Sequence, residues 1–139
     1  ISPPLGAVKN PIKFTMEKGY IVKVEGEGTD AAEYEAWLKS FNDPNMFLAA
    51  HLSFGFGPNA KLSGDIVEDE RVWGSTEWGF GNVGPQLVSD IPGGIPAASH
   101  SDGICLNSSV WLDGVQILDE GVVVGPTPRI VELARRLGK

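Results

Sequence analysis

Alternation of apolar and polar residues is the pattern that most restricts the fold of this chain. In "PIKFTMEKGYIVKVEGEG" every second residue is apolar on both sides of Lys18-Gly19. A period of two is that of a half-buried strand, and Lys-Gly between two such runs predicts a β-hairpin. A second hairpin is predicted at Asp113-Gly114, a pair typical of type I′ turns.

Two segments have helical periodicity instead. In "TDAAEYEAWLKSFNDP" the apolar residues follow one helical face, with Asp30 as the expected N-cap and Pro44 as the expected end. In "TPRIVELARRLGK", Thr127 is the expected N-cap and Pro128 the first helical residue. We count about seven short strands, which do not alternate strictly with these helices. The pattern predicts an α+β fold, with a mostly antiparallel mixed sheet and two or three flanking helices.

Three further segments carry the candidate functional residues. "MFLAAHLSFGFG" reads as a buried strand that contains His51, and "WGSTEWGFGN" as a strand that contains Glu77. Residues 82–99 are rich in Gly, Pro and Ser and are expected to form a long loop. The strand expected after this loop begins at His100.

Length and composition limit the classes of protein to consider. The 139 residues are expected to form a single domain, 1–139, large enough to bury a core. A net charge of −7 argues against nucleic-acid binding, which needs clustered basic residues. One cysteine allows no internal disulfide, and no apolar run is long enough to span a membrane. We therefore expect a cytoplasmic protein with neither nucleic-acid nor membrane partners.

The segment "SHSDG" contains a candidate metal-binding pair. Residues i and i+2 of a strand share a face, so His100 and Asp102 are expected to point the same way and Ser101 the other way. With His51 they would form the set of two imidazoles and one carboxylate found in mononuclear non-haem Fe(II) sites. Two simpler readings stay open: the pair could be ordinary polar residues on a strand, and His51 a hydrogen-bonded core histidine.

The order of these motifs resembles that of a known family. The series "HLSFGFGPNAKLSGDIVEDERVWGSTEWGFGN", "SHSDG" and "SSVWLDGVQILDEG" is similar to the C-terminal half of the thermophilic leucyl aminopeptidase (aminopeptidase T) family. Two positions depart from the peptidase pattern: His51 stands where the peptidases have a glutamate ligand, and Glu77 where they have a histidine ligand.

With these departures the chain looks like the 2,5-dihydroxypyridine 5,6-dioxygenase family, ring-cleaving enzymes of nicotinate and nicotine breakdown. The resemblance implies an aminopeptidase T-like fold, a Fe(2+) cofactor held by His51, His100 and Asp102, and a catalytic role for Glu77. It also implies an aromatic substrate, O2 as co-substrate, and N-formylmaleamate as the product.

Both families have an additional N-terminal domain, so the resemblance implies that this chain is the C-terminal metal-binding half of a longer protein. We expect such a piece to bind metal but to turn over slowly or not at all, and to form homo-oligomers. Two alternatives remain. One is a metallopeptidase that uses Glu77 with the other three residues, and the other is a binding or assembly module without catalysis.

Overall fold

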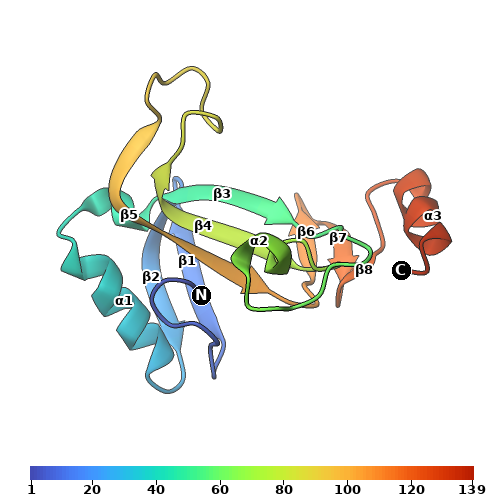
Figure 1. The fold of residues 1–139 in the computed structure, drawn as a ribbon, viewed down its shortest axis with the longest axis horizontal. Coiled ribbons are helices and arrows are strands. Elements are labelled where there is room, and N and C mark those ends of the chain that lie inside the picture. Colours follow the sequence, from blue (N-terminus) through green and yellow to red (C-terminus); the bar gives the residue numbers. More distant parts are fainter. The chain divides into compact units, whose positions relative to one another are not determined.

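The computed structural model describes residues 1–139 and has eight strands, three α-helices and one 3-10 helix (Figure 1). The elements, in chain order, are β1 (Ile12–Glu17), β2 (Tyr20–Gly26), α1 (Asp30–Ser40), η1 (Pro44–Phe47), β3 (Ala49–Phe54), α2 (Ile66–Asp69), β4 (Thr76–Val83), β5 (Ile95–Cys105), β6 (Val110–Leu112), β7 (Val115–Asp119), β8 (Val122–Val123) and α3 (Pro128–Arg136). The chain divides into two compact units, residues 1–52 with 78–103 and residues 53–77 with 104–139.

The α+β class is confirmed, but the strands form three small sheets where one mixed sheet was expected. Their orders are β1-β2, β3-β4-β5 and β6-β7-β8. In the first and the third of these sheets, antiparallel strands that follow one another in sequence are joined by short turns. Alternation predicts that such strands exist, but it does not encode which strand edges form hydrogen bonds with each other. This is why the sheets could not be separated from the sequence.

Both predicted hairpin turns are confirmed, and both use left-handed backbone. Lys18 and Gly19 between β1 and β2 have φ of 50° and 83°. Asp113 and Gly114 between β6 and β7 have φ of 49° and 80°. Two successive residues with positive φ are what a type I′ turn requires, and this turn matches the twist of the flanking strands.

Helix α1 forms where expected, but Asp30 is not its N-cap. Thr29 holds that position and makes no side-chain capping bond. The Asp30 carboxylate instead accepts hydrogen bonds from the backbone N–H groups of Lys9, at 2.7 Å, and Asn10, at 3.1 Å. Those two bonds lower the pKa of Asp30. The helix also ends before Pro44, which begins the separate helix η1.

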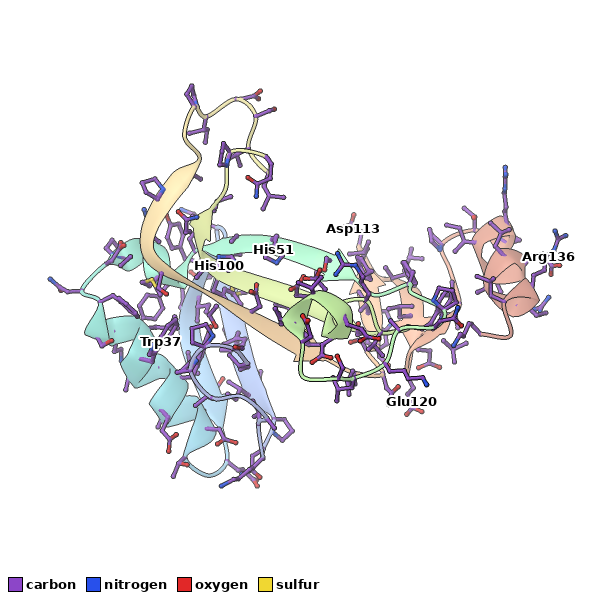
Figure 2. All side chains as sticks on the ribbon, viewed as in Figure 1. Trp37, His51, His100, Asp113, Glu120 and Arg136 are labelled. Atoms are coloured by element: carbon purple, nitrogen blue, oxygen red, sulfur yellow. The ribbon has the colours of Figure 1, made fainter.

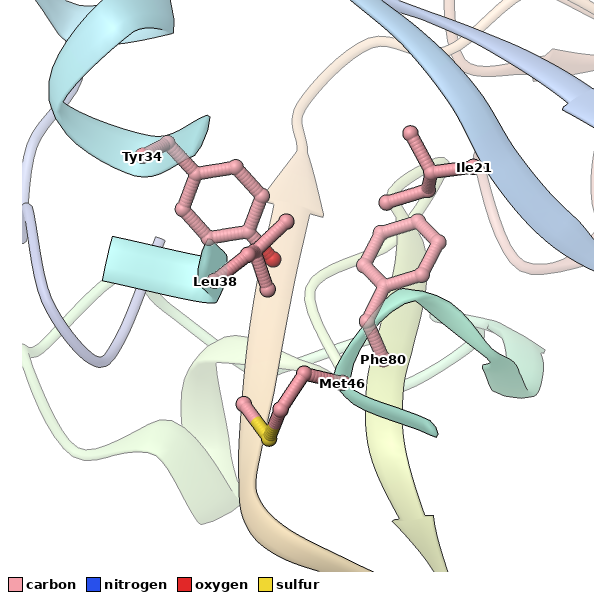
Figure 3. Packing of buried hydrophobic residues seen from close by; sticks show 5 residues of the cluster. All are labelled: Ile21, Tyr34, Leu38, Met46 and Phe80. Carbon is pink, nitrogen blue, oxygen red and sulfur yellow. The ribbon is translucent and has the colours of Figure 1, made fainter. Parts of the chain in front are cut away.

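The core of the first unit lies between α1 and the strands (Figure 3). Five side chains, each no more than 5% exposed, pack as one cluster: Ile21, Tyr34, Leu38, Met46 and Phe80. Phe80 comes from β4, so the core reaches one face of the strand that neighbours both β3 and β5.

The second unit has its own smaller core. Leu118 of β7, Val123 of β8 and Ala134 of α3 are buried together. Helix α3 begins as predicted, with the Thr127 hydroxyl accepting the Ile130 N–H and Pro128 in the first turn. The short helix α2 also belongs to this unit.

The loop expected over residues 82–99 is shorter in the structure. Strand β4 continues to Val83 and β5 begins at Ile95, which leaves residues 84–94 as the connection. The early start of β5 is supported by Asp43 and Asn45. The Asp43 carboxylate accepts the Ala98 N–H at 2.8 Å, and the Asn45 amide donates to the Pro96 carbonyl at 2.8 Å. None of the helices is both long and apolar enough to cross a membrane.

Candidate metal centre

The residues of the candidate metal site come from the two strands on either side of β4. His51 lies on β3 and His100 on β5 (Figure 2). Asp102 also lies on β5. All three belong to the first unit. One donor atom from each residue lies within 4.8 Å of the other two, so the structure brings the three predicted residues together. His51 and His100 are 49 positions apart in the sequence, and the pairing of the strands in the sheet brings them together.

The distances between donor atoms suit a single ion. The Asp102 Oδ1 atom lies 2.9 Å from His100 Nε2 and 3.5 Å from His51 Nε2. Two ligands at right angles around an ion at ~2.1 Å would lie ~3.0 Å apart. The two imidazole rings are stacked, with centroids 5.3 Å apart and planes at 17°. Small movements of the rings are therefore enough to direct all three donors at one point.

The second ring nitrogen of His100 determines which nitrogen can bind a metal. His100 Nδ1 lies 2.8 Å from the backbone carbonyl oxygen of Asn82. A carbonyl can only accept, so Nδ1 carries the proton, and in the neutral ring the lone pair is on Nε2. That is the nitrogen directed at Asp102. Hydrogen bonding of the distal nitrogen to a carbonyl is the usual arrangement for a histidine that binds metal.

Access from solvent is preserved at the three side chains. His51, His100 and Asp102 are 22%, 31% and 23% exposed, so an ion and a small ligand can reach them. A set of two imidazoles and one carboxylate leaves several positions of a six-coordinate ion open. The donor set therefore fits a metal that binds further ligands.

The opposite face of β5 is fixed to the core. Ser101 is completely buried, as its predicted orientation away from His100 and Asp102 requires. Its hydroxyl accepts a hydrogen bond from Tyr34 at 3.2 Å and donates to the Pro3 carbonyl at 2.7 Å. The backbone of Asp102 pairs in both directions with Ser2, at 2.8 and 2.9 Å. These contacts hold the strand segment that carries two of the three candidate ligands.

Glu77 is not part of this group of donors. It lies on β4 in the second unit, is 4% exposed, and accepts a hydrogen bond from the Ser53 hydroxyl at 2.8 Å. The carboxylate is therefore buried. Its catalytic role stays a prediction.

Two glycines of β4 belong to the site and were missed in the sequence. A Cβ atom built on Gly79 would lie 2.2 Å from the His51 ring, and one on Gly81 would lie 2.3 Å from the Ser99 carbonyl oxygen. Glycine inside a strand often marks close approach of another group. The two glycines in "WGFGN" therefore indicate close contacts in this strand. The sequence does not show which groups make these contacts, because that depends on the neighbouring strands.

The fold and the site together define an α+β protein with a candidate mononuclear metal centre on the β3-β4-β5 sheet. Comparison with known proteins names the family. The family model described as 2,5-dihydroxypyridine 5,6-dioxygenase matches residues 2–125, and the chain belongs to this family.

The chain is also similar to individual proteins. The 2,5-dihydroxypyridine 5,6-dioxygenase of Pseudomonas putida KT2440 is 26% identical over 121 residues, which are 83% of this chain and 34% of the relative. The solved structure of 2,5-dihydroxypyridine dioxygenase from the same organism superposes with a TM-score of 0.68 at 22% identity, over 86% of this chain and 35% of that chain. The latter likeness concerns the fold. The chain thus spans about a third of the length of these relatives, and the relation to the aminopeptidase T family stays a prediction.

Proposed function

We propose that this chain provides the metal centre of a non-haem Fe(II) dioxygenase that cleaves the ring of 2,5-dihydroxypyridine or a similar hydroxylated N-heteroaromatic compound. One observation carries the proposal. In a member of this family, His51, His100 and Asp102 converge from separate strands with donor atoms within 4.8 Å of one another. This convergence favours a ligand set over the two simpler readings of the sequence.

The three side chains would hold the ion through His51 Nε2, His100 Nε2 and an Asp102 carboxylate oxygen. The Asn82 carbonyl keeps the His100 lone pair directed at the site. The single carboxylate of Asp102 would neutralise only one of the two charges of a bound Fe(II), which would favour binding of an anionic ring oxygen. When bound, Fe(II) supplies the redox chemistry that lets a closed-shell ring react with O2. Cleavage of the 5,6 bond with both oxygen atoms retained gives N-formylmaleamate.

Glu77 is proposed as an acid/base residue of the same reaction. It is the buried carboxylate of β4, and the Ser53 hydroxyl donates to it. The variant Glu77→Gln keeps the size and the hydrogen-bond acceptor but cannot exchange a proton at neutral pH. It is expected to bind metal as the wild type does and to lower kcat.

The first experiment measures the metal. The chain is reconstituted anaerobically with Fe(II), and the bound metal is counted for the wild type, His51→Ala and His100→Ala. One equivalent in the wild type and a loss in both variants supports the proposal. Two equivalents of zinc or cobalt with hydrolysis of a leucyl amide would instead support the metallopeptidase. Unchanged metal content in both variants would leave only the binding module.

The second experiment measures the reaction. The iron-loaded chain is mixed with 2,5-dihydroxypyridine and O2, and loss of the ring absorbance is followed together with O2 uptake. Slow turnover above that of His100→Ala is expected, because the chain spans only about a third of its relatives. Binding of the ring is tested separately under argon by its effect on the visible spectrum of the Co(II)-loaded chain. No turnover and no spectral change would overturn the substrate assignment.

A further inference from the structure

Strand β4 supplies no candidate metal ligand, although it lies between the two strands that do. The ligands of β3 and β5 flank it on either side. Adjacent strands are ~4.8 Å apart, so donors from β3 and β5 can meet only above the backbone of β4. A side chain of β4 on that face would occupy the same space. The strand therefore needs a residue without a side chain where the ligands converge.

Gly79 is that residue. An added Cβ would lie 2.2 Å from Cε1, 2.4 Å from Nδ1 and 2.8 Å from Nε2 of His51. Real Cβ atoms do not approach other atoms this closely, because the optimal separation of non-bonded carbon atoms is about 3.5–4.0 Å. The imidazole of His51 thus lies directly against the backbone of Gly79.

We propose that Gly79 is a positioning residue for the metal centre, and that the absent side chain at this position places the His51 ring for ligation. This inference rests on the metal site proposed above. It assigns a function to a residue of β4 that has no donor atom of its own. The glycine acts through His51, since any larger residue would move the ring away from His100 and Asp102.

Gly81 is required for a different reason. Its φ of 102° is in the region that favours glycine, and an added Cβ would lie 2.3 Å from the Ser99 carbonyl oxygen. Its obstacle is backbone, which cannot rotate away. A substitution at Gly81 should therefore disturb the sheet itself, whereas one at Gly79 should disturb a side chain.

The variant Gly79→Ala separates the site from the fold. The φ of Gly79 is not among the positive values, so alanine fits the backbone. The colliding atoms belong to the His51 ring, which can rotate. Gly103→Ala is the matched control, because it is next to Asp102 and its Cβ would have only ordinary contacts, at 3.5 Å to Ile1 and 3.8 Å to Trp78.

Calorimetric titration with Fe(II) under argon tests the inference. Gly79→Ala is expected to weaken binding by about ten- to a hundred-fold, as loss of a group that orients a ligand does. Gly103→Ala is expected to bind as the wild type does. Equal affinity of Gly79→Ala and the wild type would overturn the inference, while absence of binding in all three proteins would overturn the proposed metal site.

If none of the three proteins binds Fe(II), two measurements on the metal-free protein still test the inference about Gly79. The His51 ring resonances in the NMR spectrum of the metal-free protein should move in Gly79→Ala and stay unchanged in Gly103→Ala. Gly79→Ala should lower the free energy of unfolding more in the wild type than in the His51→Ala variant. The His51→Ala variant has no imidazole ring for the added methyl group to displace. Unmoved resonances, or equal destabilisation in both backgrounds, would show that Gly79 does not position His51.

Discussion

The buried Tyr34 hydroxyl predicts how stability changes in alkaline solution. Tyr34 is 1% exposed, and its hydroxyl donates to Ser101, between two of the candidate ligands. Burial raises the pKa of Tyr34 from 10.0 to about 12, and the negative charge of Asp102 adds to the increase. The folded state therefore needs the neutral phenol. The perturbation is Tyr34→Phe, which removes the ionisable group and keeps the ring.

The sign and size of the effect follow from the pKa. A pKa raised on folding means that the native state holds its proton longer than the unfolded state does. The contribution is complete below the unfolded pKa of 10.0 and is lost as pH rises through about 12. The free energy of unfolding should fall by ~1.4 kcal/mol per pH unit over this window, about 3 kcal/mol in total. Tyr34→Phe loses instead one hydrogen bond, about 1 kcal/mol at every pH.

Urea unfolding of both proteins from neutral to strongly alkaline pH provides the assay. The variant should be the less stable protein at neutral pH and the more stable one near pH 12, so the two curves should cross. All other ionisable groups are the same in both proteins, so their contributions cancel in the difference. Parallel stability curves would refute the argument.

Three other substitutions test the packing around the site, each by urea unfolding. Leu38→Ala empties a completely buried position of the first core and should cost about 3 kcal/mol. Ser101→Ala leaves the Tyr34 hydroxyl and the Pro3 carbonyl without their partner and should cost about 2 kcal/mol. Gly114→Ala meets no atom within 4 Å but has a φ of 80°, so it should cost only about 1 kcal/mol of backbone strain.

Local features of the fold could be predicted from the sequence, and pairings between distant segments could not. Lys18-Gly19 and Asp113-Gly114 determine their turns through backbone preferences that neighbouring residues already contain. The failure at Asp30 has the opposite cause. Its carboxylate has the right position for a cap, but the N–H groups of Lys9 and Asn10, about 20 residues earlier in the chain, bind it instead. Competition of this kind is decided by tertiary structure.

The same distinction between local features and distant pairings applies to the candidate site. His100 and Asp102 could be paired from the period of a strand, and their shared face is confirmed. Their partner His51 could be suggested from its residue type, as the second of two histidines. Its proximity to them could not be predicted, because nothing in the sequence states that β3 and β5 both neighbour β4. Gly79 was missed for the same reason. Glycine has no functional group, so the role of Gly79 can be inferred only once the position of the His51 ring against it is known.

The two faces of β5 differ in burial, and this difference keeps the candidate site accessible on a small unit. Ser101 faces the core and is completely buried, while His100 and Asp102 on the other face remain 31% and 23% exposed. The rigidity that a metal site needs can then come from the buried face, through Tyr34 and Pro3, without closing the face that an ion must reach. Substitutions on the two faces should accordingly have separable effects. Those on the core face should lower the free energy of unfolding first, and those on the face with Gly79 should lower metal affinity first.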